Sequence, residues 1–360
     1  SANQSAREAA RAERRATRAA RGQAEPQAQA PQDRQVFDIL IVAQGGGLDR
    51  QAAILAASLH RNAPDFPGRL IVAEPLPQDA WAGVDTRIGG QARAALDAFG
   101  AEIRPFAARH FGRSYPYGNK IEALGVPDLD RPFLFLDSDT LITGDIGRVP
   151  FDFTRPSASM RREGTWPEPP LYGPGHDAIW RSLYDRFGLQ MDGSLELSQP
   201  DDHWERYLYF NAGWFFGADP AEFGRRFLDW ARAVRDEPGE ALACQSLDPW
   251  LDQVVLPLVI HSLGGGRPGP ELAGLDGDVT THYRNLPLLY ARGPERAIAE
   301  MEAIAALPQI APLMQGWAPA ERLIGQGIGR KQIAPMFADQ IPLKEKALRH
   351  RLRAADLWLV

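Results

Sequence analysis

The chain has 360 residues, a length that suits one large α/β domain or two smaller ones. Hydrophobic residues make up 44% and charged residues 24%, which is ordinary for a soluble globular protein, and the single cysteine excludes a disulfide framework or a cysteine-rich zinc site. The formal net charge is −6, and residues 1–34 and 344–360 each carry a balance of +3, which leaves −12 for residues 35–343. A domain this acidic argues against nucleic acid as a partner.

The N-terminal segment has almost no large apolar side chains and cannot contribute to a core. We expect residues 1–35 to form a flexible or helical basic tail. Apolar runs are of strand length, far below the roughly 20 residues of a membrane-spanning helix, and no signal peptide is readable. These features predict a soluble, cytoplasmic protein.

Strands and helices alternate from residue 36 onward. Apolar runs predict strands at 36–43, 69–74, 101–106 and 132–136, and helical periodicity predicts helices at 48–61, 91–99 and 119–124. Because helices separate strands that are apolar on both faces, we expect an α/β fold, a Rossmann-like and mostly parallel sheet with helices on both faces. Ligands of such sheets bind where the strands end.

The first strand ends at Ala43 and Gln44, and Gly45-Gly46-Gly47 follows. The glycines either form a turn that needs positive φ or let the backbone approach a ligand closely. On the second reading, Ala43 and Gln44 are candidates for the wall of a nucleotide site.

The fourth strand ends in Asp137-Ser138-Asp139. Two carboxylates about 4 Å apart repel each other by about 4 kcal/mol at an effective dielectric of 20, a cost that a divalent cation removes. Carboxylate oxygens suit Mg²⁺ or Mn²⁺. The alternative is that both acids are solvated turn residues, since Asp-x-Asp is common by chance.

Further polar segments occur in a fixed order around this pair. They are residues 117–120 (YGNK), 133–146 (FLFLDSDTLITGDI), 209–216 (YFNAGWFF), 248–253 (DPWLDQ) and 281–283 (THY). Together these segments resemble the metal-dependent nucleotide-sugar glycosyltransferases of the GT-A fold. They are most similar to the retaining family that includes glycogenin and the bacterial lipooligosaccharide galactosyltransferases.

The resemblance implies a GT-A-like catalytic domain over residues 36–290, with an insertion at about 155–202. It implies transfer of a hexose from a nucleoside diphosphate sugar, UDP-hexose by family default, to an acceptor hydroxyl that the sequence does not identify. It also implies retention of anomeric configuration. Residues 291–360 lie outside the resemblance, and we expect them to form a helical C-terminal annex.

The resemblance also implies roles for individual residues. It assigns Mn²⁺ or Mg²⁺ to Asp137, Asp139 and His282, and catalytic roles to Asn211, Asp252 and Gln253. It assigns substrate contacts to Asn119, Lys120, Asp137, Ser138 and Gly213. Ala43 and Gln44 in the first loop, and Arg284 after the histidine, are further candidates for substrate contacts that the resemblance does not supply.

Each of these residues has a plainer interpretation. Lys120 fits an ordinary surface lysine, and Asn211 fits the cap of a strand end. Asp252 lies at a predicted helix start, where an acid stabilises the helix dipole. A lone histidine such as His282 is more often a hydrogen-bonded structural residue than a metal ligand.

The sequence departs from the family after the histidine. The family's Gly-x-x-Lys-Pro-Trp is absent, and the chain reads His282-Tyr283-Arg284-Asn285-Leu286-Pro287. Arg284 is therefore the candidate cation for the diphosphate.

Two other functions are compatible with the same fold. A sugar nucleotidyltransferase needs a basic residue in the first loop, which Gln44-Gly45-Gly46-Gly47-Leu48 lacks. A non-catalytic nucleotide-sugar-binding or scaffold protein is the other alternative.

The C-terminal segment, residues 343–360, reads as a basic amphipathic helix with Leu348, Leu352, Ala355 and Leu359 on one face. Such a helix either makes peripheral contact with an anionic membrane or packs its apolar face on the domain.

Overall fold

The structure is a computed structural model that describes residues 34–162, 164–342 and 344–360. All but the last two residues of the predicted basic tail lie outside these ranges. Gln35–Val360 form one compact unit. Within the described residues, every helix is too short or too polar to cross a bilayer.

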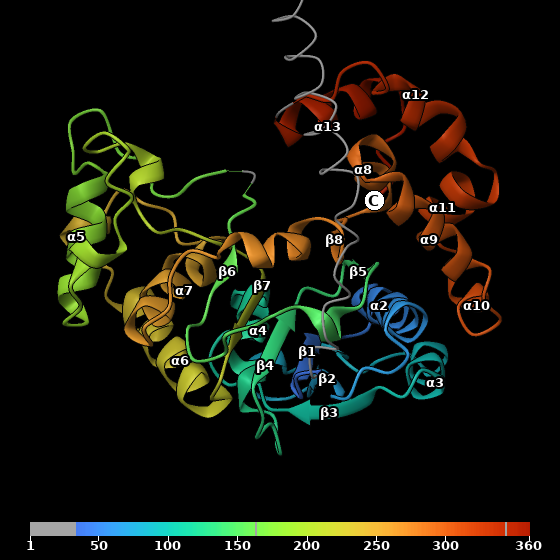
Figure 1. The fold of residues 1–360 in the computed structure, drawn as a ribbon, viewed down its shortest axis with the longest axis horizontal. Helices are drawn as coiled ribbons and strands as arrows, with labels where there is room; N and C mark the ends of the chain where they lie inside the picture. Colours follow the sequence, from blue (N-terminus) through green and yellow to red (C-terminus); the bar gives the residue numbers. More distant parts are fainter. Residues whose placement is uncertain (1–33, 163, 343) are drawn as a thin grey trace, which may run out of the picture. The chain divides into compact units, whose positions relative to one another are not determined.

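Strands and helices alternate through the first half of the chain and helices dominate the second half (Figure 1). The strands are β1 (Asp38–Val42), β2 (Leu70–Pro75), β3 (Glu102–Phe106), β4 (Phe133–Leu136), β5 (Thr140–Ile142), β6 (Ala158–Ser159), β7 (Asn211–Gly217) and β8 (Thr280–His282). The longer helices are α2 (Leu48–Asn62), α3 (Gly90–Ala98), α5 (His176–Arg186), α6 (Pro220–Asp236), α7 (Leu251–Ser262), α8 (Leu286–Arg292), α9 (Glu295–Ala305) and α13 (Glu345–Ala354). The short helices are α4 (Asn119–Glu122), α10 (Ala311–Met314), α11 (Ala318–Ala320) and α12 (Ala334–Met336), with π-helical turns at Glu321–Gly325 and Gly329–Ile333.

The main sheet has six strands in the order β3-β2-β1-β4-β7-β6. β1 pairs in parallel with β2 and β4, and β2 with β3, whereas β7 runs antiparallel to both β4 and β6. The four early strands and the three helices predicted between them all form within a few residues of the expected bounds. The predicted α/β class with a mostly parallel sheet is confirmed.

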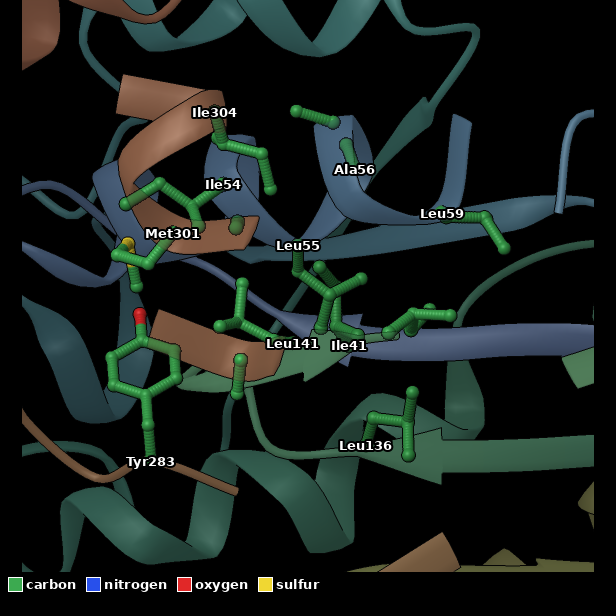
Figure 2. Packing of buried hydrophobic residues seen from close by; sticks show 14 of the residues in the cluster. Ile41, Ile54, Leu55, Ala56, Leu59, Leu136, Leu141, Tyr283, Met301 and Ile304 are labelled. Atoms are coloured by element: carbon green, nitrogen blue, oxygen red, sulfur yellow. The ribbon is translucent and has the colours of Figure 1, made fainter. Parts of the chain in front are cut away.

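Buried side chains pack on both faces of the main sheet because other elements cover its central strands on each side. On β1, Ile39 and Ile41 belong to one buried cluster and Leu40 and Val42 to the other. The first cluster includes α2 and α3 and continues into α9, so that Ile41 and Leu55 share it with Met301 and Ile304 (Figure 2). α4, α6 and α7 supply much of the second cluster.

A second, two-stranded sheet pairs β5 with β8 in antiparallel fashion. Its register sets Thr140 opposite His282, and the amide of Tyr283 donates to the Asp139 carbonyl at 3.0 Å. β5 starts directly after the acid pair, and β8 ends at the histidine. The pairing of β5 with β8 therefore brings the segments that carry Asp139 and His282 side by side, although they are distant in the sequence.

The predicted insertion and C-terminal annex both form ordered elements. Residues 155–202 contain β6, at the edge of the main sheet, and α5; Trp166 and Trp180 are buried there rather than free to stack on a ligand. In the annex, α13 buries Leu348 and Leu352 completely in the first cluster. α13 ends at Ala354, so the apolar face is shorter than the sequence predicts, and it packs on the domain.

Candidate active site

A cavity of about 770 Å³ opens where β4 and β7 meet the β5–β8 sheet. This is within the size range of small-ligand sites in proteins. Of the predicted site residues, the following line it: Asn119, Lys120, Asp137, Ser138, Asp139, Asn211, Asp252, Gln253, His282 and Arg284. Ala43, Gln44 and Gly213 do not line it.

Asp137, Asp139 and His282 form a compact group that could hold a metal ion. One atom from each side chain lies within 4.8 Å of the other two. His282 Nε2 is 3.0 Å from Asp139 Oδ1 and 3.9 Å from Asp137 Oδ2. All three side chains are only partly exposed, and repulsion between two carboxylates at 4.8 Å is about 3 to 4 kcal/mol at an effective dielectric of 20. Two carboxylates and an imidazole nitrogen at this spacing fit a divalent cation.

His282 and Asp139 shift each other's pKa. Burial by itself disfavours the imidazolium, but the charge of Asp139 and its hydrogen bond outweigh burial, and the pKa of His282 lies above its usual value. Burial likewise disfavours the Asp139 carboxylate, and His282 outweighs it, so that the pKa of Asp139 is lowered. Both shifts favour a charged pair in the absence of a cation.

Lys120 is not the surface lysine of the plainer interpretation. It is buried, and its Nζ lies 2.9 Å from Asp137 Oδ1 and 3.3 Å from Asp252 Oδ2. It also donates to the Ala212 carbonyl at 3.1 Å. Burial alone lowers the pKa of Lys120, yet the two carboxylates raise it above the usual value, so the ammonium stays charged. Lys120 thus links the metal-ligand group to the first turn of α7.

Asp252 is held from the opposite side by Tyr115. The Tyr115 hydroxyl lies 2.8 Å from Asp252 Oδ1 and 3.0 Å from the Pro249 carbonyl, and it accepts the backbone N–H of Asp252 at 3.1 Å. Burial of the Asp252 carboxylate raises its pKa, while Lys120 and Tyr115 oppose that shift. The predicted helix start is confirmed, because α7 begins at Leu251 and places Asp252 in its first turn.

Asn211 and Gln253 have their side-chain oxygens already engaged. Asn211 Oδ1 accepts the amide of Gly213 at 2.8 Å, in agreement with the strand-cap interpretation, although the side chain also lines the cavity. Gln253 Oε1 accepts the hydroxyl of Tyr209 at 2.9 Å. The amide nitrogens are thus the groups left to meet a ligand.

The two residues of the predicted nucleotide wall do not line the cavity. Ala43 is fully buried in the core, and its amide pairs with Ala73. Gln44 contacts a residue that lines the cavity, because its Oε1 accepts a hydrogen bond from Asn119 Nδ2 at 3.0 Å. Asn119 in turn accepts from the Trp81 indole at 2.9 Å.

Several residues at the site have no role in the sequence-based prediction. Tyr115 and Tyr209 orient predicted residues through their hydroxyls. Trp250 and Arg349 line the cavity directly. Tyr209 and Trp250 stand inside the motif segments 209–216 and 248–253 and could have been named from them. Tyr115 and Arg349 could not, because only the tertiary fold brings them to the site.

A family model and several solved structures are similar to this chain. A family model described as the Rhodobacterales glycosyltransferase domain matches residues 39–264. No curated protein matches the chain. Among solved structures, the galactosyltransferase LgtC with donor and acceptor sugar analogues is 16% identical, covers 79% of this chain and 100% of its own, and has a TM-score of 0.45.

Two further solved structures are similar over part of their length. The bifunctional glycosyltransferase WbbM is 12% identical, with a TM-score of 0.44, over 79% of this chain and 52% of its own. The glycosyltransferase GlyE of Streptococcus pneumoniae is 13% identical, with a TM-score of 0.35, over 77% of this chain and 53% of its own.

The family match defines the class of protein to which the fold and the site point. Because the family model covers more than half of the chain, the chain belongs to the Rhodobacterales glycosyltransferase domain family. The glycosyltransferase class predicted from the motif segments is thereby confirmed.

Proposed function

We propose that the chain transfers a hexose from a nucleoside diphosphate sugar to an acceptor hydroxyl with the help of Mn²⁺ or Mg²⁺. The observation that carries this proposal is the approach of Asp137, Asp139 and His282 to within 4.8 Å of one another at the cavity. A nucleotide sugar brings a diphosphate into a domain of net charge −12, so a cation or a local basic pocket must offset that charge for it to bind.

Asp137, Asp139 and His282 would hold the cation. When bound, a divalent ion supplies a Lewis acid for the charge that develops on the leaving diphosphate. To act as a ligand, His282 would have to be unprotonated at Nε2, the nitrogen that lies 3.0 Å from Asp139 Oδ1. Lys120 lies 2.9 Å from Asp137 Oδ1 and would hold that carboxylate in a fixed direction.

The other residues bind and orient the sugars. The buried Asp252 is restrained by Lys120 and Tyr115, and its carboxylate suits one sugar hydroxyl held in a fixed direction. The amide nitrogens of Asn211 and Gln253, which both line the cavity, would donate to further hydroxyls of the sugars. A hexose as the transferred group, UDP as the carrier and retention of configuration come from the resemblance of the motif segments.

Substitution of Asp139 tests this function. We expect Asp139→Asn to lower metal-dependent hydrolysis or transfer from a panel of nucleotide sugars by more than about 100-fold, since loss of even an outer-shell partner commonly costs 10- to 100-fold. The matched control is Asp278→Asn, which removes a carboxylate whose side chain is 99% exposed, four residues before His282.

The outcomes separate the candidate functions. Turnover that survives both Asp139→Asn and excess chelator contradicts the metal-dependent mechanism. Tight binding of Mn²⁺ and nucleotide by the wild type without turnover of any sugar favours the non-catalytic alternative. Synthesis of a sugar nucleotide from a nucleoside triphosphate and a sugar phosphate favours the nucleotidyltransferase alternative.

A further inference from the structure

A buried carboxylate in the C-terminal helix contacts arginine side chains from three separate segments. Glu345, the first residue of α13, is only 4% exposed. Its carboxylate lies 2.8 Å from Arg292 Nη2 at the end of α8 and 3.5 Å from Arg284 Nη1 after β8. It also accepts from Arg349 Nε at 2.7 Å, one turn further along α13. One carboxylate therefore contacts guanidinium groups from the end of α8, the loop after β8 and α13.

Two of these arginines face the cavity of the proposed active site. Arg284 and Arg349 line it together with Asp137, Asp139 and His282. Their side chains are 26% and 40% exposed, so the guanidinium groups are fixed by Glu345 and still open to a ligand. Arg349 comes from a helix far outside the segments that carry the family resemblance.

The backbone at Arg284 indicates that its position is imposed by the surroundings. Its φ is +63°, a left-handed conformation that non-glycine residues seldom adopt. The next residue, Asn285, fixes the turn: its amide donates to the Tyr283 carbonyl at 2.7 Å, and its side chain caps α8 by accepting from Leu288 N at 3.0 Å. Such strain outside glycine concentrates at functional sites.

We propose that Arg349, together with Arg284, binds the diphosphate of the donor, and that Glu345 is the positioning residue for both. The C-terminal helix then completes the donor pocket. Planar guanidinium groups match phosphate oxygens in paired hydrogen bonds, which a lysine cannot do. This inference rests on the proposed function, because it names the cations that meet the donor of that same reaction.

The packing of α13 favours this role over a lipid surface. Leu348 and Leu352 are fully buried in the domain core, so the helix has no free apolar face over that stretch to insert into a bilayer. The competing interpretation is that Glu345 and Arg349 form a structural pair one helical turn apart, which contributes little to ligand binding.

Calorimetric titration of the full chain with UDP in the presence of Mn²⁺ tests the proposal, with inorganic pyrophosphate as a second probe. We expect Arg349→Ala to raise the Kd of both probes by about 10-fold or more, as for loss of a hydrogen bond to a charged group. Arg349→Lys should recover part of the affinity. Glu345→Gln should weaken the binding of both probes, although Glu345 itself makes no contact with them. The matched control is Lys346→Ala, which removes a positive charge from an exposed position of the same helix.

The results distinguish this inference from the function on which it rests. Unchanged UDP affinity in Arg349→Ala overturns the inference, and so does a loss for UDP that pyrophosphate does not share. An equal loss in Lys346→Ala also overturns it, because any positive charge on the helix would then serve. Failure of the wild type itself to bind either UDP or pyrophosphate with Mn²⁺ instead removes the proposed function, and this inference with it. Thermal unfolding of each variant identifies any that has lost its fold. If Arg349→Ala is one of these, the affinity of Arg349→Lys for UDP and pyrophosphate decides in its place.

Discussion

The hydroxyl of Tyr115 offers a direct test of how the site is held together. It lies against the Asp252 carboxylate at 2.8 Å and accepts the Asp252 amide at 3.1 Å, in a buried position. That amide stands in the first turn of α7, where backbone N–H groups have no partner within the helix. Tyr115→Phe removes only the hydroxyl, so it leaves the Asp252 amide unpaired and Asp252 Oδ1 without this donor, while Lys120 still lies 3.3 Å from Oδ2.

The expected cost follows from these two contacts. A hydrogen bond to a charged group contributes about 1.5 to 3 kcal/mol, and a buried unsatisfied group costs about 1 to 3 kcal/mol, so we expect a loss of about 3 kcal/mol in the free energy of unfolding. Urea unfolding followed by tryptophan fluorescence measures it. Tyr172→Phe, at a side chain that is 96% exposed, is the matched control and should change stability by less than about 0.5 kcal/mol.

The pH dependence of this difference gives a second check. Burial, followed by the charge of Asp252, raises the pKa of Tyr115 above its usual value. A raised folded-state pKa makes the contribution fully present below the unfolded value of about 10 and lost as the pH rises beyond it. The difference between wild type and Tyr115→Phe should therefore be constant from about pH 6 to 9. Equal unfolding midpoints, or a difference that decays within this range, would refute the reasoning.

Two further substitutions probe the metal-ligand group and the C-terminal helix. In Gly213→Ala the new Cβ would lie 2.6 Å from His282 Nδ1 and 3.0 Å from Asn211 Oδ1, so we expect the imidazole to be displaced. Mn²⁺ affinity measured by electron paramagnetic resonance should fall by about 10-fold or more, and an unchanged affinity would contradict the placement of the ring. Leu352→Ala should lower the free energy of unfolding by about 2 to 5 kcal/mol, because it leaves a cavity in the core. No change in the urea midpoint would mean that the helix does not pack as described.

The main sheet could be predicted because its strands are continuous apolar runs. β1 and β4 are buried on both faces, and only a parallel or doubly covered position accepts such sequences. The polar segments that follow these strands then had to meet at one edge. This reasoning brings Asp139 toward the cavity without any structural information, and the β5–β8 register completes the approach of His282.

Other contacts were beyond the sequence because they depend on packing between distant segments. Tyr115 meets Asp252 across 137 positions, and no periodicity in the sequence marks that pair. Arg349 reaches the cavity only because Leu348 and Leu352 seat α13 on the core. Local sequence predicts that α13 is amphipathic, but it does not distinguish a protein core from a membrane as the apolar partner.

Crystals grown with Mn²⁺ and UDP, measured at the manganese absorption edge, give the most direct test of the metal site. We predict one strong anomalous peak among the side chains of Asp137, Asp139 and His282, in contact with a phosphate oxygen of the nucleotide. Clear density for UDP with no peak between these three side chains, or with manganese bound elsewhere, would contradict metal-dependent sugar transfer at this cavity.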